Sequence, residues 1–252
     1  MTITIGADPE VFLNDGNIIV SAIGHVGGTK EVPVPVMGGA VQEDNVLAEF
    51  NIDPAANVVE FITNIKSVMG QLRERVHPLG ITVQSSHIFT RQALMRSGRK
   101  ALMFGCDPDY NAYTGDANTP PSPLTELRTA GGHVHIGYEN PSDERSYVIA
   151  KNMDLLLGVP SVLLDSDTRR RSMYGRAGAI RMKPYGVEYR SLSNFWLQHT
   201  DLMAWVFNQS VLAANSDLLV SNDDSIKVVD CINNSDRTVA EQLLNKYKVM
   251  LP

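Results

Sequence analysis

Residues 132–138 have the sequence GHVHIGY, in which large apolar side chains alternate with two histidines. Successive side chains of a β-strand point to opposite faces. This spacing therefore predicts a strand with Val134, Ile136 and Tyr138 on one face. His133 and His135 then lie together on the other face.

The same alternation places charged residues on one face of other predicted strands. In residues 47–52, Glu49 lies opposite an apolar face, and Asp8 and Glu10 share a face where the first strand begins. In residues 187–193, Glu188 and Arg190 share a face. For each strand taken alone, a solvated face is the simpler interpretation, because antiparallel sheets commonly expose one face to solvent. Together the set is rich in carboxylates and imidazoles and poor in lysine, which favours a site.

Residues 41–45 are harder to interpret. Glu43 falls on the face of Val41, opposite Gln42 and Asp44, so the alternation does not clearly assign it to the polar set.

The overall pattern predicts an α+β fold with a largely antiparallel sheet backed by helices, in one domain over residues 1–252. The clearest helix is expected at residues 54–76, with Asp53 as its cap and Pro54 in its first position. Further helices are expected at residues 142–157, 166–173, 200–218 and 236–250. Strands are expected at residues 10–13, 17–23, 41–45, 47–52, 81–85, 132–138 and 187–193.

Carboxylates held close together raise one another's pKa unless cations neutralise them. Mg²⁺ and Mn²⁺ bind carboxylate oxygens and an occasional imidazole, which matches the residue types in the set. An isolated HxH is a weak signal by itself, and it also fits a zinc hydrolase or a cupin-like site. The set as a whole predicts a divalent-metal site.

Basic residues concentrate between positions 169 and 183, where the sequence contains Arg169, Arg170, Arg171, Arg176, Arg181 and Lys183. Arginine suits bidentate contacts with phosphate oxygens, so this segment is a candidate anion site. The run at 169–171 equally fits a solvated helix. GHVGGTK at residues 24–30 lacks the spacing of a phosphate-binding P-loop, so a glycine turn is the simpler interpretation, and the role of Lys30 stays open.

The composition excludes several classes of protein. With 22 Lys and Arg against 28 Asp and Glu, the net charge of −6 argues against stable nucleic-acid binding. The two cysteines, Cys106 and Cys231, form no disulfide framework or metal knuckle, and both are expected to be buried thiols in a reducing compartment. The N-terminus has no signal-peptide pattern, and the apolar stretch at residues 155–164 is too short to span a membrane.

Five motifs together resemble the glutamine synthetase and glutamate-cysteine ligase superfamily, and most closely its phage-type carboxylate-amine (COOH-NH2) ligases. They are GADPEVF, DNVLAEFNIDPA, CDPDYNAY, GGHVHIG and GVEYRSLSNFW, which span residues 6–196 in this order. The resemblance implies a glutamine synthetase catalytic-domain-like sheet, in which paired acids, an HxH strand and an ExR strand line a funnel that binds ATP and divalent ions. The separate N-terminal domain of glutamine synthetase has no counterpart in this sequence.

The resemblance also implies a role for each matching residue. The metal ligands would be Asp8, Glu10, Glu43, Glu49, His133 and Glu188, although Glu43 could trade roles with Asp44. His135 would lie beside substrate or phosphate, and Arg190, Arg181 and His135 would be the catalytic residues. Arg176, Arg181, Lys183 and Arg190 would bind the phosphates of ATP.

The expected activity is ATP-dependent amide or peptide bond formation through an acyl phosphate, with Mg²⁺ or Mn²⁺. The expected partners are a small-molecule or peptide carboxylate and an amine. The expected location is the cytoplasm, which is that of the host if the chain is phage-encoded. The superfamily contains rings and monomers, so an oligomer is compatible with the sequence. Three alternatives stay open: a phosphagen-kinase-like phosphotransferase, a metal-dependent hydrolase, and a non-catalytic binding protein of the same fold.

Overall fold

The computed structural model describes residues 2–102, 109–119 and 125–252 of the 252-residue chain. Cys106, and with it the start of the CDPDYNAY motif, lies outside the described residues. Cys231 is buried, as expected from the sequence.

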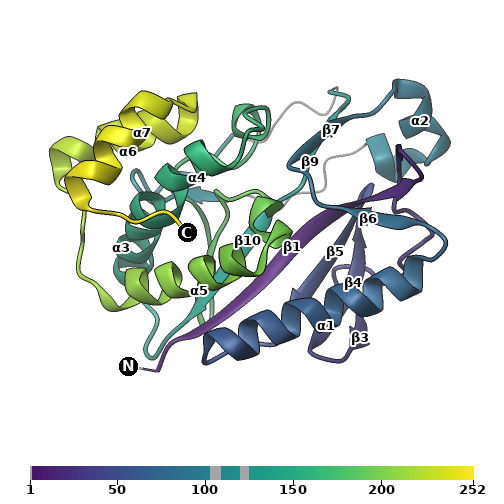
Figure 1. Ribbon diagram of the computed structural model, residues 1–252, viewed down its shortest axis with the longest axis horizontal. Coiled ribbons are helices and arrows are strands. Elements are labelled where there is room, and N and C mark those ends of the chain that lie inside the picture. Colours follow the sequence, from purple (N-terminus) through teal and green to yellow (C-terminus); the bar gives the residue numbers. More distant parts are fainter. Residues whose placement is uncertain (1, 103–108, 120–124) are drawn as a thin grey trace.

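A ten-stranded sheet forms the centre of the described structure, and its pairings are antiparallel (Figure 1). Its main path runs in the order β3-β4-β5-β1-β10-β12-β11-β8, with β2 and β6 paired to β1 off this path. The strands of the main path are β3 (Val34–Val36), β4 (Gly39–Asp44), β5 (Leu47–Ile52), β1 (Thr4–Asp15), β10 (Gly132–Gly137), β12 (Gly186–Tyr189), β11 (Ala179–Lys183) and β8 (Tyr110–Asn111). The two strands off the path are β2 (Ile18–Val20) and β6 (Gly80–Thr82), and a separate two-stranded sheet pairs β7 (Ser86–Ile88) with β9 (Leu127–Thr129). The predicted α+β class with a largely antiparallel sheet is confirmed.

Strand β1 connects the halves of the sheet, because it changes partner along its length. Its first half, Thr4 to Pro9, pairs with β10, whereas Glu10 and Val11 pair with β5. Its last residues pair with β2 and β6. Motifs that lie more than 120 residues apart in sequence therefore become neighbours across this strand.

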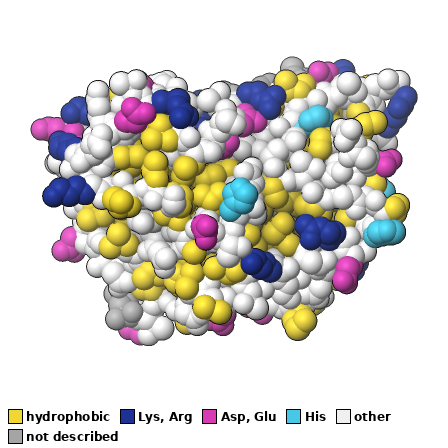
Figure 2. Space-filling view, viewed as in Figure 1, with side chains coloured by type: hydrophobic (Ala, Val, Ile, Leu, Met, Phe, Trp, Pro, Cys, Tyr) yellow, Lys and Arg dark blue, Asp and Glu magenta, His cyan; other side chains and the backbone are white. Residues whose placement is uncertain are grey.

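Helices cover one face of this sheet. Figure 1 shows α1 (Val58–Val76) and α5 (Thr200–Asn215) lying in front of the strands. The other helices are α2 (Arg91–Arg96), α3 (Asp143–Met153), α4 (Val159–Leu164), α6 (Asn222–Asn234) and α7 (Arg237–Tyr247). Short 3₁₀ segments occur at Arg99–Leu102, Arg170–Ser172 and Asn194–Gln198. On the face that Figure 2 presents, apolar side chains gather across the middle, and Lys, Arg, Asp and Glu lie mostly toward the margins.

Helix α1 begins four residues later than the sequence predicted. Ala55 forms a β-bridge with Ile5, exchanging two backbone hydrogen bonds of 2.9 Å, so the chain is still extended after Pro54. The N-cap is Asn57, whose side chain accepts a hydrogen bond from the backbone N–H of Glu60 at 3.0 Å. The prediction of Asp53 as the cap was wrong, because the strand pairing of Ala55 overrides the local helix signal.

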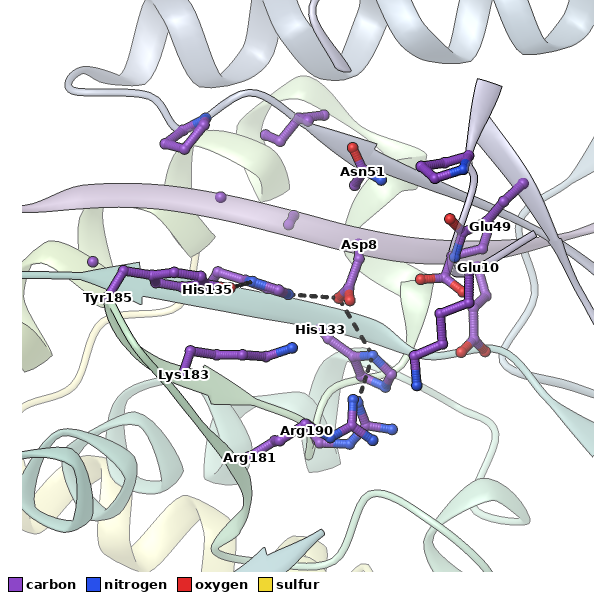
Figure 3. Close-up of a pocket in the computed structure, with 18 of the residues that line it drawn as sticks. Asp8, Glu10, Glu49, Asn51, His133, His135, Arg181, Lys183, Tyr185 and Arg190 are labelled. Carbon is purple, nitrogen blue, oxygen red and sulfur yellow. Dashed lines mark hydrogen bonds and ion pairs between the residues drawn. The ribbon is translucent and has the colours of Figure 1, made fainter. Parts of the chain in front are cut away.

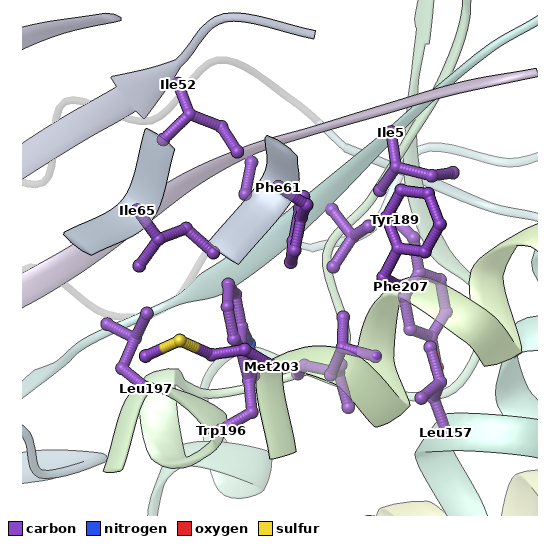
Figure 4. Close-up of a cluster of buried hydrophobic side chains, with 14 of the residues drawn as sticks. Ile5, Ile52, Phe61, Ile65, Leu157, Tyr189, Trp196, Leu197, Met203 and Phe207 are labelled. Carbon is purple, nitrogen blue, oxygen red and sulfur yellow. The ribbon is translucent and has the colours of Figure 1, made fainter. Parts of the chain in front are cut away.

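The main apolar core lies between the sheet and these helices (Figure 4). The ring of Phe61 on α1 stacks on Trp196 with centroids 6.0 Å apart and contacts Phe207 on α5 at 5.5 Å. Ile5 and Tyr189 contribute from the strands and are fully buried. Burial of aromatic side chains of this size supplies much of the free energy that holds a helix layer on a sheet. The apolar face predicted for residues 132–138 is part of this core.

Helices α3 and α4 join through a π-helical segment, Asp154–Gly158, into one long helix. By length and composition, Asp143–Leu164 is apolar enough to cross a membrane, with a mean hydropathy of 1.4, but 72% of that window is buried inside the protein. Such burial is typical of a core helix. The sequence had predicted a helix only up to residue 157.

The sequence did not predict helices α2, α4 and α6 or several short strands, among them β3, β9 and β11. The helix predicted at residues 166–173 is only the 3₁₀ turn Arg170–Ser172.

Candidate active site

The pleat of the sheet gathers the polar residues on the face away from the helices. Residues directly opposite each other in an antiparallel pair point to the same face. In the pairing of β1 with β10, Asp8 lies opposite His133. His135 lies opposite Glu188 in the next pairing, and Glu188 lies opposite Arg181 in the one after it. The row therefore continues across four strands.

A second row crosses the other half of the sheet. Glu10 on β1 lies opposite Glu49 on β5, and Glu49 lies opposite Gln42 on β4. Asp44, two residues along from Gln42, shares its face. The two rows meet at β1, where Asp8 and Glu10 are also two residues apart.

These rows line a cavity of about 550 Å³ (Figure 3). Carboxylates and imidazoles line its β1 and β10 side, and cationic side chains line its β11 and β12 side. The lining residues that carry the argument are Asp8, Glu10, Lys30, Asp44, Glu49, His133, His135, Arg181, Lys183, Tyr185 and Arg190. A cavity of this size can hold a small ligand.

The first candidate ligand group consists of Glu10, Asp44 and Glu49, which offer oxygens within 4.8 Å of one another. The backbone positions Glu10 firmly. Its Oε2 accepts a 2.7 Å hydrogen bond from the N–H of Gly131, and its carbonyl accepts a 2.7 Å bond from the side chain of Asn194. Such fixed carboxylates are the ligands that hard divalent cations prefer.

The electrostatics of this group favour the addition of positive charge. Burial and the charge of Asp44 raise the pKa of Glu10 to about 8. Burial and the charges of Asp8, Asp44 and Glu10 raise the pKa of Glu49 well above its usual value. Burial also raises the pKa of Asp44, against the opposing effect of Lys30. Without a cation, the group retains protons near neutral pH.

The second candidate ligand group consists of Asp8, His135 and Glu188, whose ligand atoms also lie within 4.8 Å of one another. Asp8 Oδ1 and His135 Nε2 are 3.0 Å apart, yet neither atom has a hydrogen bond of acceptable geometry to any residue that the structure describes. A buried carboxylate oxygen and imidazole nitrogen this close together can also bind one cation between them. Burial raises the pKa of Asp8, but the two histidines lower it more, to well below its usual value.

Glu188 is fully buried and surrounded by cations. Its carboxylate pairs with Lys183 at 2.8 Å, with Arg181 at 3.3 Å and closely with Arg190. Burial and the charge of Asp8 raise the pKa of Glu188. Arg190, together with the histidines, outweighs them and lowers it to about 2. Glu188 therefore stays ionised at neutral pH.

His133 is buried between charges of both signs. Its Nδ1 lies 3.4 Å from Asp8 Oδ1 and 3.4 Å from the guanidinium of Arg190. Burial and the nearby charge of Arg190 lower the pKa of His133 to about 4, so its ring is neutral at neutral pH. A neutral imidazole is the form that binds cations.

A smaller cavity of about 60 Å³ adjoins the first and shares Glu10, His133 and Arg190 with it. Arg170 lines this second cavity. Two of its guanidinium nitrogens donate to the carbonyls of Ser191 and Arg190, at 2.8 and 3.1 Å. Arg170 therefore braces the backbone beside the ExR strand and also contributes positive charge to the site.

Most of the sequence-predicted residues line the cavity. Glu188 is buried in contact with lining residues but is not itself in the lining, and Glu43 and Arg176 lie elsewhere. Glu43 points to the other side of β4, where its Oε1 accepts hydrogen bonds from the backbone N–H groups of Gly24 and Gly27 at 2.8 and 3.0 Å. Asp44 takes the place beside Glu10 that the sequence had offered to either residue. Arg176 is exposed and does not line the described cavity, whereas Arg181, Lys183 and Arg190 do.

Both histidines of the HxH strand converge on Asp8 and Glu188. His135 completes the second ligand group, and His133 Nδ1, for which the resemblance implied a metal-ligand role, lies 3.4 Å from Asp8 Oδ1 and 3.7 Å from Glu188 Oε1. Sequence reasoning missed Tyr185 and Asp109, whose carboxylate lies 3.6 Å from Arg190 Nε. Asp109 stands in the CDPDYNAY motif, which was the available signal for it. Tyr185 had none.

The second half of the chain is similar to a known protein family. Residues 121–236 match the family described as phage phiEco32-like COOH.NH2 ligase-type 2. This match confirms the resemblance to the phage-type carboxylate-amine ligases. Its span contains the histidines, arginines and Glu188 of the cavity, whereas the acids on β1, β4 and β5 precede it. Only the geometry of the cavity associates these acids with the matched residues.

No curated protein matches the chain. Among solved structures, the bifunctional glutathione synthetase from Pasteurella multocida is similar, with a TM-score of 0.44 and 11% sequence identity. The superposition covers 98% of this chain and 49% of that one, so the chain spans about half the length of the solved protein.

Proposed function

We propose that the protein is an ATP-dependent carboxylate-amine ligase that joins a carboxylate to an amine in this cavity. The ligase-type family match supports the reaction class. The observation that carries the proposal is the cavity itself, in which two groups of metal-ligand side chains face Arg181, Lys183 and Arg190. Metal-ligand side chains opposite these three cationic residues, here called the cationic wall, suit a bound nucleoside triphosphate.

The residues present fit divalent cations. Glu10, Asp44 and Glu49 offer only oxygens, which suit Mg²⁺ or Mn²⁺, and Asp8, His135 and Glu188 add one imidazole. The raised pKa of Glu10 indicates that Arg170 and Arg190 do not fully compensate the buried acids on this side, which favours an added cation. Bound Mg²⁺ or Mn²⁺ would neutralise phosphate oxygens and polarise the phosphorus–oxygen bonds.

The cationic wall would hold and orient the triphosphate. Arg190 presents a planar guanidinium fork, which can contact two phosphate oxygens at once, and Lys183 presents a point charge. Glu188 holds both side chains in place through its ion pairs. These residues would therefore stabilise the charge on the transferring phosphoryl group without moving far.

The proposed reaction has two steps. A carboxylate oxygen of the first substrate attacks the γ-phosphorus of ATP, which yields an acyl phosphate and ADP. The amine nitrogen then attacks the acyl carbon and expels inorganic phosphate, and the proton that the amine loses passes to a base. The protein provides positioning and electrostatic stabilisation, so no serine or cysteine nucleophile is required.

The test is a screen of carboxylates and amines with ATP and Mg²⁺, in which ADP, inorganic phosphate and new products are measured by mass spectrometry. The proposal predicts amine-dependent release of ADP and phosphate together with an amide. A phosphorylated amine without free phosphate would indicate a phosphotransferase, and product formation without ATP would indicate a hydrolase. If ATP and Mn²⁺ bind but no substrate pair gives a product, the protein is a non-catalytic binding protein and the ligase proposal is wrong.

A further inference from the structure

The turn between β11 and β12 brings Tyr185 to the rim of the cavity, and the backbone there has little freedom. The carbonyl of Tyr185 accepts a 3.0 Å hydrogen bond from the N–H of Tyr138. Gly186 follows with a φ of +147°, and a Cβ at that position would lie 2.0 Å from the carbonyl oxygen of Ile136. The turn is thus fixed against β10, the strand that carries the two histidines.

The side chain of Tyr185 contacts His135 in two ways (Figure 3). Its hydroxyl lies 2.5 Å from Nδ1 of His135. The two rings are also stacked, with centroids 6.0 Å apart and planes inclined by 19°. The hydrogen bond fixes the rotation of the imidazole about its χ2 angle, and the stacking fixes its tilt. Nε2 on the other edge of the ring then faces Asp8 Oδ1 at 3.0 Å.

We propose that Tyr185 is a positioning residue for His135, whose hydroxyl holds the imidazole with Nε2 directed at the cation site formed with Asp8 and Glu188. The inference rests on the proposed function, because that site is part of it. A metal-binding histidine uses one ring nitrogen as a ligand, and the hydrogen bond at the other nitrogen sets its orientation and tautomer. The oxygen of Tyr185 accepts the Nδ1 proton, which leaves the lone pair of Nε2 for the cation.

A phenol suits this task better than a stronger acid or base. A hydroxyl can accept or donate, so it stays bonded to Nδ1 whichever nitrogen of the ring carries the proton. Phenylalanine would keep the stacked ring and lose only the hydroxyl. Tyr185→Phe therefore separates the hydrogen bond from the packing.

The experiment measures Mn²⁺ affinity by calorimetry for wild type, Tyr185→Phe, His135→Ala and the double variant, with thermal unfolding as a check on the fold. Tyr110→Phe is the matched control, because Tyr110 is exposed to a similar extent, 43% against 45%, and does not line the cavity. We expect Tyr185→Phe to weaken binding about 10- to 100-fold, the usual cost of removing such a partner. In the His135→Ala background, the same change should have no further effect.

Each result is decisive. Equal Mn²⁺ affinities for wild type and Tyr185→Phe would overturn the positioning role, as would a full loss in the His135→Ala background. If His135→Ala leaves the affinity unchanged while Asp8→Asn abolishes binding, His135 is not a ligand; the inference fails and the metal site stands. Absence of Mn²⁺ binding by the wild type would refute the proposed function itself.

Discussion

Replacing Glu10 by glutamine should stabilise the metal-free protein. The pKa of Glu10 is raised from 4.5 to about 8 by burial and by Asp44. At pH 7 the unfolded chain carries Glu10 ionised, whereas the folded protein keeps it protonated. The pH of 7 lies about 2.5 units above the unfolded pKa of 4.5, and this difference lowers the free energy of unfolding by about 3 kcal/mol. Glutamine is neutral in both states, and its carbonyl can still accept the hydrogen bond from Gly131.

The pH dependence has a definite sign. A group whose pKa is higher in the folded state contributes stability that is present below its unfolded pKa and is lost as the pH rises toward the folded value. The advantage of Glu10→Gln should therefore be small at pH 5 and reach about 3 kcal/mol at pH 7. It should stop growing above pH 8.

Glu188→Gln, the same substitution in the same cavity, should act in the opposite direction. The pKa of Glu188 is lowered to about 2, chiefly because Arg190 and the histidines outweigh burial. Glutamine removes the charge that compensates these buried cations, at a cost of about 3 kcal/mol at pH 7. This contribution of Glu188 is present above pH 4.5 and is lost as the pH falls toward 2.

The assay is urea unfolding in EDTA at pH 5 and pH 7, repeated with Mn²⁺ present. Glu241→Gln, at an exposed position on α7, is the control for the substitution itself. Mn²⁺ should raise the free energy of unfolding of wild type and of Glu241→Gln, and it should raise that of Glu10→Gln and Glu188→Gln by less. If Glu10→Gln lowers the free energy of unfolding in EDTA, or if both cavity variants shift it in the same direction, the electrostatic account of the cavity is refuted.

Three further predictions test other parts of the structure. Arg190→Lys should lower kcat at least about tenfold in the ADP-release assay, because a point charge cannot replace the guanidinium fork, while Arg91→Lys on the surface should not. Burial raises the pKa of Asp154 to about 7, so wild-type stability should fall by about 2 kcal/mol between pH 5 and pH 7 from this group. In urea unfolding, the free energy of unfolding of Asp154→Asn should lack this decrease between pH 5 and pH 7, even if the variant differs from wild type by a constant amount. Gly132→Ala should cost about 2 kcal/mol or more in the same measurement, because the new Cβ would lie 2.3 Å from the carbonyl oxygen of Ser193.

Side-chain alternation explains why much of the cavity could be predicted from the sequence. A strand has a period of two, so the polar faces of residues 47–52 and 132–138 could be assigned without knowing their partners. The same rule, applied strictly to residues 41–45, places Asp44 with Gln42 and sends Glu43 to the other side. The structure shows this arrangement. The likeness to a family motif had favoured Glu43, whereas the alternation of side chains favours Asp44.

Other features depend on contacts that no local pattern contains. Helix α1 starts late because Ala55 pairs with Ile5, fifty positions earlier in the chain. Strand β1 extends through Pro9, although proline and the neighbouring Gly6 and Asp8 locally indicate a turn. Arg176 carries the positive charge that a phosphate-binding residue needs, but the turn that contains it faces solvent. Only the tertiary arrangement distinguishes it from Arg181.

Buried carboxylates are stabilised differently in the two halves of the cavity. Around Glu188, the chain supplies its own cations, so this carboxylate stays ionised in the metal-free protein. Around Glu10 and Glu49, burial and the repulsion between neighbouring acids outweigh the charges of Arg170 and Arg190, and these acids retain protons instead. A divalent cation must therefore displace protons on one side and compete with arginine and lysine on the other. Under the proposed function, metal binding is therefore coupled both to the protonation of Glu10 and Glu49 and to the ion pairs of Glu188.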